Sequence, residues 1–89
     1  MPIFSVHYDL NLPDEYAAFY DALETYKHLH VMDGCWLIEA PCNATDIRDQ
    51  LRPHLTSQDA LLVTHVNEDW AGAGTQCGDW LNENQRSFG

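Results

Sequence analysis

The chain opens on a run in which apolar and polar side chains alternate: Ile3-Phe4-Ser5-Val6-His7-Tyr8-Asp9-Leu10. Alternation with a period of two is typical of a β-strand, because successive side chains point to opposite faces of a sheet. One face would carry Phe4, Val6, Tyr8 and Leu10, and the other Ile3, Ser5, His7 and Asp9. We therefore predict a first strand over residues 3–10, with His7 and Asp9 on the same face.

The next segment changes to a helical period. Pro13 suits a first helical turn, and the acidic side chains of Asp14 and Glu15 are favourable at the positive end of a helix dipole. Large apolar residues then recur at positions i, i+3, i+4 and i+7: Tyr16, Phe19, Tyr20 and Leu23. This spacing predicts an amphipathic helix over residues 14–27.

The following residues predict a β-hairpin. Two short runs, residues 28–32 and 35–40, flank the dipeptide Asp33-Gly34. This dipeptide favours the tight turn of a hairpin, and Pro41 ends the second run.

A second helix and a fourth strand complete the pattern. Asn43 can cap a helix with a single apolar stripe made of Ala44, Ile47, Leu51 and Leu55. Pro53 is expected to weaken the last turn of this helix, because proline removes a backbone donor. Residues 60–66 are apolar except for two polar positions, and they predict the fourth strand.

The predicted order is β-α-β-β-α-β, the ferredoxin-like split pattern of an α+β protein. Four antiparallel strands would carry both helices on one face. We expect one domain over residues 1–89, with a core at 1–67 and a C-terminal extension at 68–89. The extension contains Trp70, Trp80, Leu81 and Phe88, so a short helix near residues 79–84 should pack onto its own or a neighbouring sheet.

The fourth strand is apolar on both of its faces, with Leu61 and Val63 on one and Leu62 and Val66 on the other. A four-stranded sheet in a monomer needs only one apolar face. The second face is therefore expected to meet another subunit, and we predict a homodimer.

Charge and composition restrict the partners. Fourteen Asp and Glu residues against four Lys and Arg give a net charge of −10, which disfavours RNA or DNA as a partner, because neutralising a phosphate backbone takes several cationic contacts. The acidity either keeps the protein dissolved or imitates a nucleic acid toward a basic protein partner.

The odd number of cysteines, without a zinc-ribbon spacing, predicts reduced thiols and a cytoplasmic location. No run approaches the roughly 18–20 apolar residues of a membrane span, and no secretory signal is visible.

Asp9 is the leading candidate for chemistry. An acidic side chain at the end of a buried strand must be solvated, paired or bound to a cation. It could cap the following turn through Asn11 or the helix start, or it could hold Mg²⁺ that orients a water for attack on a phosphodiester. One carboxylate binds Mg²⁺ weakly, and a two-fold dimer would supply the second. His7 shares its face and could act as a general acid or base.

Several segments together resemble a known family: the strand end Tyr8-Asp9-Leu10, the aromatic helix, Trp36-Leu37-Ile38 in the hairpin, and Leu61-Leu62-Val63 in the last strand. In pattern and order they resemble the family of CRISPR adaptation nucleases known as the second CRISPR-associated protein. This family includes the VapD-type ribonuclease toxins as relatives. The nearest likeness is to short proteins labelled SinR-family, and it extends through Trp80-Leu81.

The resemblance implies a ferredoxin-like homodimer in which Asp9 binds Mg²⁺ at the dimer cleft and RNA or DNA is cleaved. The chain departs from the family at the segment after the first strand, where Asn11-Leu12-Pro13-Asp14-Glu15 replaces a segment rich in Arg and Lys. A substrate phosphate would meet repulsion there, on the order of 1 kcal/mol per close pair in water.

Two functions follow as hypotheses. The first is a metal-dependent nuclease in phage defence or in a toxin, in which Asp9 binds Mg²⁺ and His7 or Tyr8 assists proton transfer. The second is a non-catalytic acidic interaction module, such as a nucleic-acid-mimicking inhibitor of another protein. No residue pattern indicates an organic cofactor.

Overall fold

The computed structural model describes residues 1–11, 16–67, 69–73 and 77–81. Along these ranges the elements follow in the order β1 (Ile3–Asp9), α1 (Ala17–Glu24), β2 (Lys27–Met32), β3 (Cys35–Glu39), α2 (Ala44–Leu51), a short 3-10 helix η1 (Arg52–His54), β4 (Ala60–Val66) and α3 (Cys77–Leu81). In the described ranges, no helix is long and apolar enough to cross a membrane.

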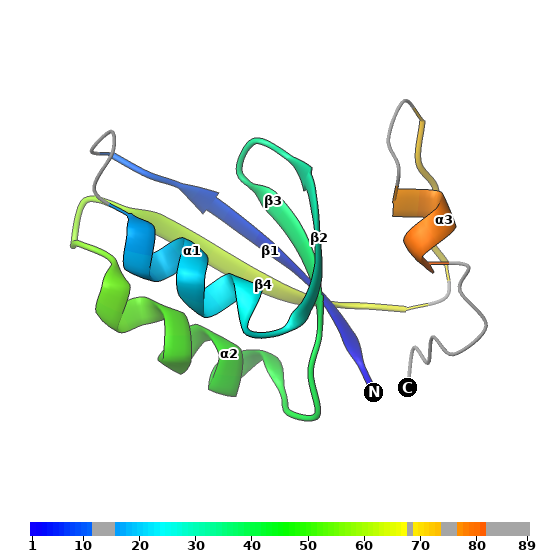
Figure 1. Ribbon diagram of the computed structural model, residues 1–89, viewed down its shortest axis with the longest axis horizontal. Helices are drawn as coiled ribbons and strands as arrows, with labels where there is room; N and C mark the ends of the chain where they lie inside the picture. Colours follow the sequence, from blue (N-terminus) through cyan, green and yellow to red (C-terminus); the bar gives the residue numbers. More distant parts are fainter. Residues whose placement is uncertain (12–15, 68, 74–76, 82–89) are drawn as a thin grey trace.

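The strands form one sheet in the order β2-β3-β1-β4, and every neighbouring pair is antiparallel. Helices α1 and α2 lie side by side over one face of this sheet (Figure 1). The α+β class and the four-stranded antiparallel sheet predicted from the sequence are thus confirmed. The face that carries α1 and α2 is called the helix face below, and the opposite one the open face.

The main core lies between the sheet and these two helices. Its fully buried side chains come from every layer: Val6 from β1, Phe19 and Leu23 from α1, Ile38 from β3, and Ile47 and Leu51 from α2. The alternation along β1 places Phe4 and Val6 in this core, as the two-residue period predicted. Burial of such side chains stabilises the fold by roughly 1.5–3 kcal/mol each.

A second, smaller cluster covers part of the open face. Ile3 and Leu37 of the sheet are buried together with Leu81 of α3, and the partly buried Trp70 and Trp80 pack against them. The described part of the C-terminal extension therefore packs on the sheet of its own chain. Helix α3 begins at Cys77, before the predicted start at residue 79. Phe88 and the rest of residues 82–89 lie outside the described residues.

The helix boundaries differ from the predicted ones at both ends of α1. The predicted start at residues 14 and 15 lies outside the described residues, and α1 is described from Ala17. It ends at Glu24 rather than at residue 27, because Lys27 already pairs with Glu39 in the sheet.

Helix α2 begins and ends where local chemistry predicts. The Asn43 side chain accepts a hydrogen bond from the backbone N–H of Asp46 at 2.9 Å, and the Asp46 carboxylate accepts one from the Asn43 backbone at 3.4 Å. This reciprocal pair is a capping box. At the other end, the chain tightens into η1, which contains Pro53.

The β2–β3 turn brings its glycine against β1. Gly34 has a φ of +76°, a conformation that costs other residues steric energy. Its carbonyl accepts a hydrogen bond from the Tyr8 backbone N–H at 3.0 Å. A Cβ added at Gly34 would lie only 2.8 Å from the Tyr8 carbonyl oxygen. The predicted Asp33-Gly34 turn is therefore confirmed, and its glycine is also needed for this close approach.

Candidate functional site

The end of β1 divides the predicted site residues between the two faces of the sheet. Tyr8 points to the helix face and packs against the main core. His7 and Asp9 alternate with Tyr8 along the strand and therefore lie on the open face. The structure thus brings His7 and Asp9 to one face and separates Tyr8 from them.

His7 belongs to a short line of polar side chains on the open face. Its Nε2 lies 3.0 Å from the Ser5 hydroxyl oxygen, and that oxygen lies 2.6 Å from the Thr64 hydroxyl on β4. These contacts fix the imidazole along β1 while leaving the ring only half-buried. A ring held in this way can accept or donate a proton at the surface.

Asp9 is exposed at the end of β1, where its Cα pairs with Ala60 of β4. Within the described ranges, the Asp9 carboxylate has no hydrogen-bond or ion-pair partner. The sequence left open a role for Asp9 in capping the next turn through Asn11. The Asn11 backbone N–H instead donates to a carboxylate oxygen of Asp59, at 2.8 Å.

Asp59 is the acidic residue that organises the loops at this end of the sheet. One of its oxygens also accepts from the Tyr16 hydroxyl at 2.6 Å, and the other accepts from the Thr56 backbone N–H at 2.7 Å and from the Thr56 hydroxyl at 3.1 Å. Desolvation opposes ionisation here, but these hydrogen bonds outweigh it and lower the pKa of Asp59 to about 2. Asp59 is thus a structural anion.

Tyr8 is held by the hairpin. Its hydroxyl oxygen accepts a hydrogen bond from the Trp36 indole Nε1 at 2.8 Å. Burial raises the pKa of Tyr8 to about 12, and neighbouring Tyr20 adds to the rise. The phenol therefore stays protonated at neutral pH, and its position on the helix face places it apart from His7.

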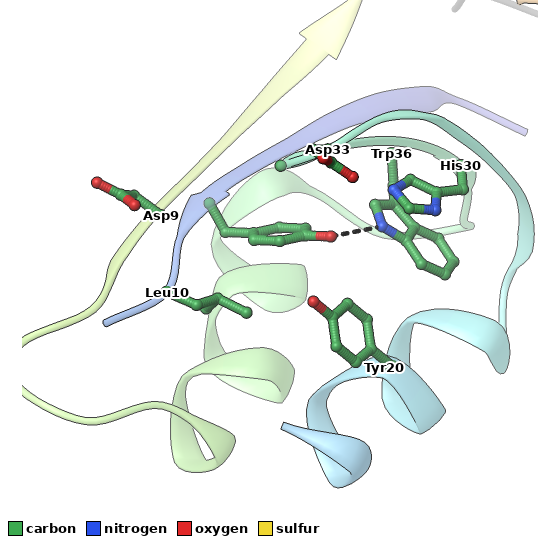
Figure 2. Close-up of a pocket in the computed structure, with 8 residues that line it drawn as sticks. Asp9, Leu10, Tyr20, His30, Asp33 and Trp36 are labelled. Carbon is green, nitrogen blue, oxygen red and sulfur yellow. Dashed lines mark hydrogen bonds between the residues drawn. The ribbon is translucent and has the colours of Figure 1, made fainter. Parts of the chain in front are cut away.

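The rings around Tyr8 line a pocket of about 410 Å³ between β1, α1 and the β2–β3 turn. The lining residues are Tyr8, Asp9, Leu10, Tyr20, His30, Asp33, Gly34 and Trp36. The dashed line in Figure 2 marks the hydrogen bond from the Trp36 indole to the Tyr8 hydroxyl, and the Asp9 carboxylate points away from the rings. Asp33 extends from the turn in the direction of His30 and Trp36.

The remaining histidines of the strands do not form a metal-binding cluster with His7 in the described residues. His28 and His30 both lie against the Trp36 ring, with centroid distances of 5.3 and 4.7 Å, and His65 lies against Phe4. Across the described part of the chain, no group of three or more His, Cys, Asp or Glu side chains could hold a metal ion. A metal at Asp9 would need ligands from water, substrate or a second chain.

Comparison with known proteins shows the fold and nothing more specific. No family model matches the chain, and no curated protein matches it. Among solved structures, the chain is similar to a hypothetical protein, TT1823, from Thermus thermophilus. The two share 21% identity with a TM-score of 0.67 over 82% of this chain and 90% of the other.

Two features of this region were missed in the sequence. The role of Asp59 has a weak local signal, since Thr56 and Asp59 have the Thr-x-x-Asp spacing of a capping motif. The aromatic pocket has no signal in the sequence, because Tyr20 and Trp36 occupy ordinary core spacings.

Proposed function

We propose that the chain forms a ferredoxin-like, nuclease-like homodimer in which two copies of Asp9 hold Mg²⁺ and a phosphodiester of RNA or DNA is cleaved. The observation that carries this proposal is the position of Asp9. Its carboxylate is exposed at the end of β1, on the open face that also carries His7. The strand order β2-β3-β1-β4 supports the ferredoxin-like assignment.

The residues fit weak Mg²⁺ binding by one chain and stronger binding by two. Mg²⁺ is held by one or two carboxylates plus waters and substrate phosphates, so a second Asp9 completes the protein's share of the ligands. The bound ion would supply an activated water and neutralise charge on the phosphate. His7, which contacts Ser5 and lies on the same face as Asp9, would move the proton.

The open face supports the dimer. Leu62 of β4 is 58% exposed there, and Met32 at the end of β2 is 54% exposed. The cluster formed with α3 covers Ile3 and Leu37 of the open face, and Leu62 is not part of it. A second copy seated on Leu62 would bury this side chain close to Asp9, since both residues line one shallow hollow.

Charge favours a second candidate function, an acidic interaction module without catalysis. The net charge is −10, and the cationic residues in the described ranges are Lys27, Arg48 and Arg52. Arg48 already contacts Asp49 at 2.9 Å. Such a surface suits a basic groove on another protein better than a phosphate backbone.

A cleavage assay separates the two functions. Purified protein is incubated with labelled RNA and with duplex DNA, with and without Mg²⁺ or Mn²⁺, beside Asp9→Asn. The matched control is Asp21→Asn, which removes the same charge from the exposed surface of α1. We expect metal-dependent cleavage that Asp9→Asn abolishes and Asp21→Asn retains. Equal cleavage by both variants contradicts the nuclease proposal, and no cleavage by any of them favours the interaction module.

Loss of the His7 imidazole tests the proton-transfer part of this proposal. His7→Ala should lower the cleavage rate by about 10²- to 10⁴-fold, the usual contribution of a positioned acid or base. Metal binding should persist, because Asp9 is unchanged. A rate within a few fold of wild type would remove His7 from the mechanism.

A further inference from the structure

The pocket beside Tyr8 combines aromatic rings with negative charge. Its lining includes Asp9, whose carboxylate points away from the rings, and Asp33, whose carboxylate extends toward them (Figure 2), and it contains no lysine or arginine among the described residues. An anionic ligand would meet repulsion here, and a cationic ligand would be attracted.

The planes of the Tyr8 and Tyr20 rings are inclined to each other, whereas Tyr20 and Trp36 are stacked. The Tyr8 and Tyr20 rings lie 6.0 Å apart at an interplanar angle of 73°, and Tyr20 lies 6.2 Å from Trp36 at 27°. Trp36 is only 4% exposed, so it closes the floor, whereas Tyr8 and Tyr20 are half-buried and reach the opening. The electron-rich face of an aromatic ring attracts cations, and rings at right angles contact one from two sides.

The ring orientations are fixed by neighbouring contacts. The Trp36 indole donates to the Tyr8 hydroxyl at 2.8 Å, and the His30 ring stacks on the indole at 4.7 Å and 18°. The Phe19 ring meets the Tyr8 ring edge to face at 5.1 Å. Pre-positioned rings lose little conformational entropy when a ligand binds.

We propose that this pocket binds a small organic cation of the alkylammonium class. The cationic head would lie against the ring faces of Tyr8 and Tyr20, with the Asp33 carboxylate supplying opposite charge at the turn (Figure 2). The volume of about 410 Å³ lies within the usual range for small-molecule pockets. A bare metal ion is less well served, since the described residues form no cluster of three metal-ligating side chains.

This site is separate from the proposed nuclease site. The rings lie on the helix face, whereas His7 and Asp9 lie on the open face, and the Asp9 carboxylate points away from the rings (Figure 2). Binding at the pocket can therefore be measured whether or not the protein cleaves nucleic acid.

A pair of isosteric ligands tests the proposal on the unmodified protein. Choline is titrated against the assigned indole N–H resonance of Trp36, with ionic strength kept constant by NaCl. Its neutral isostere, 3,3-dimethyl-1-butanol, is titrated in parallel. We expect a saturable shift with choline and binding at least about threefold weaker for the neutral alcohol, because the alcohol lacks the cation–π term. Equal binding of the two ligands, or no saturable shift with choline, overturns the proposal.

Three single substitutions locate the site. Tyr20→Leu removes a ring face and Asp33→Asn removes the charge at the turn, and each should weaken choline binding by at least about threefold. Asp21→Asn removes an exposed charge from the same helix as Tyr20 without touching the lining, and it should leave binding within twofold of wild type. Unchanged binding by both Tyr20→Leu and Asp33→Asn would place choline elsewhere and contradict the assignment.

Discussion

The Asp59 carboxylate joins its own loop before β4 to Asn11 and Tyr16, which lie 48 and 43 residues earlier in the sequence. It accepts hydrogen bonds from the Asn11 backbone, from the Tyr16 hydroxyl before α1, and from Thr56 before β4. Charge-assisted hydrogen bonds of this kind are stronger than neutral ones. Ionisation of Asp59 therefore strengthens the hydrogen bonds that hold Asn11, Tyr16 and Thr56 together at this end of the sheet.

The first prediction at the residue scale concerns pH. The pKa of Asp59 is lowered from 3.8 to about 2 in the folded protein, so its ionised form stabilises the fold above pH 4. As the pH falls from about 4 to about 2, the unfolded chain takes up the proton first, and this stabilisation is lost. Urea unfolding should show a midpoint that falls across this window in the wild-type protein.

Asp59→Asn provides the comparison. It should unfold at a lower urea concentration at neutral pH and depend less on pH between about 4 and 2. Asp21→Asn, which lies outside the network, should keep the wild-type pH dependence. An Asp59→Asn protein with the full wild-type pH dependence would contradict the role of Asp59.

Gly34 gives a second prediction at this scale. Its φ of +76° disfavours any Cβ, and an added Cβ would lie 2.8 Å from the Tyr8 carbonyl oxygen. Gly34→Ala should lower the free energy of unfolding by about 2 kcal/mol or more, of which about 1–2 kcal/mol comes from the backbone conformation. Gly72→Ala, at an exposed position without a positive φ, should change it by less than about 0.5 kcal/mol. Similar stabilities for the two variants would refute this interpretation.

These residues also show what single positions in a sequence reveal. The Asp33-Gly34 dipeptide predicted the tight turn of the hairpin, because turn preferences are local. The Asn11 and Tyr16 partners of Asp59 are 48 and 43 residues away along the chain, so no local pattern could identify them, whereas the Thr56 partner is three residues away and has a local spacing signal. Asp9, by contrast, was placed correctly at the strand end and on the face of His7, because alternation depends only on neighbouring residues.

At the scale of elements, the capping box of α2 supplies another prediction. The Asn43 side chain satisfies the Asp46 backbone N–H, which otherwise lacks an intrahelical acceptor. Asn43→Ala should lower the free energy of unfolding by about 1 kcal/mol, measured by urea denaturation. Asn43→Ser should restore most of this loss. Thr45→Ala, an exposed change within the same turn, should cost less than the cap substitution, and an equal cost would contradict the cap.

The predicted boundaries of helices and strands were most accurate where the sequence fitted only one type of secondary structure. Strand β4 spans Ala60–Val66 as predicted, since its apolar run is bounded by polar residues. The end of α1 was placed three residues late, because Lys27 fits a helix as well as a strand and its pairing with Glu39 decides the outcome. The pocket between α1 and the hairpin was not predicted, since it depends on how three elements meet.

At the scale of the whole molecule, the open face carries the remaining prediction. If a second copy covers it, the protein should have a mass near twice the 10.2 kDa of one chain by light scattering. Leu62→Glu should convert it to a monomer that keeps the wild-type circular dichroism spectrum, because a charge would be buried without a partner at the interface. Ala18→Glu, an exposed change on α1, should remain dimeric. A monomeric wild-type protein would refute the dimer.

The most direct test of the central claim is the stoichiometry of Mn²⁺ binding, measured from the electron paramagnetic resonance signal of the free ion. A cation shared by the Asp9 carboxylates of two protomers requires one ion per two chains, lost in Asp9→Asn and retained in Asp33→Asn. One ion per chain, or the same binding by wild type and Asp9→Asn, would contradict a shared metal site.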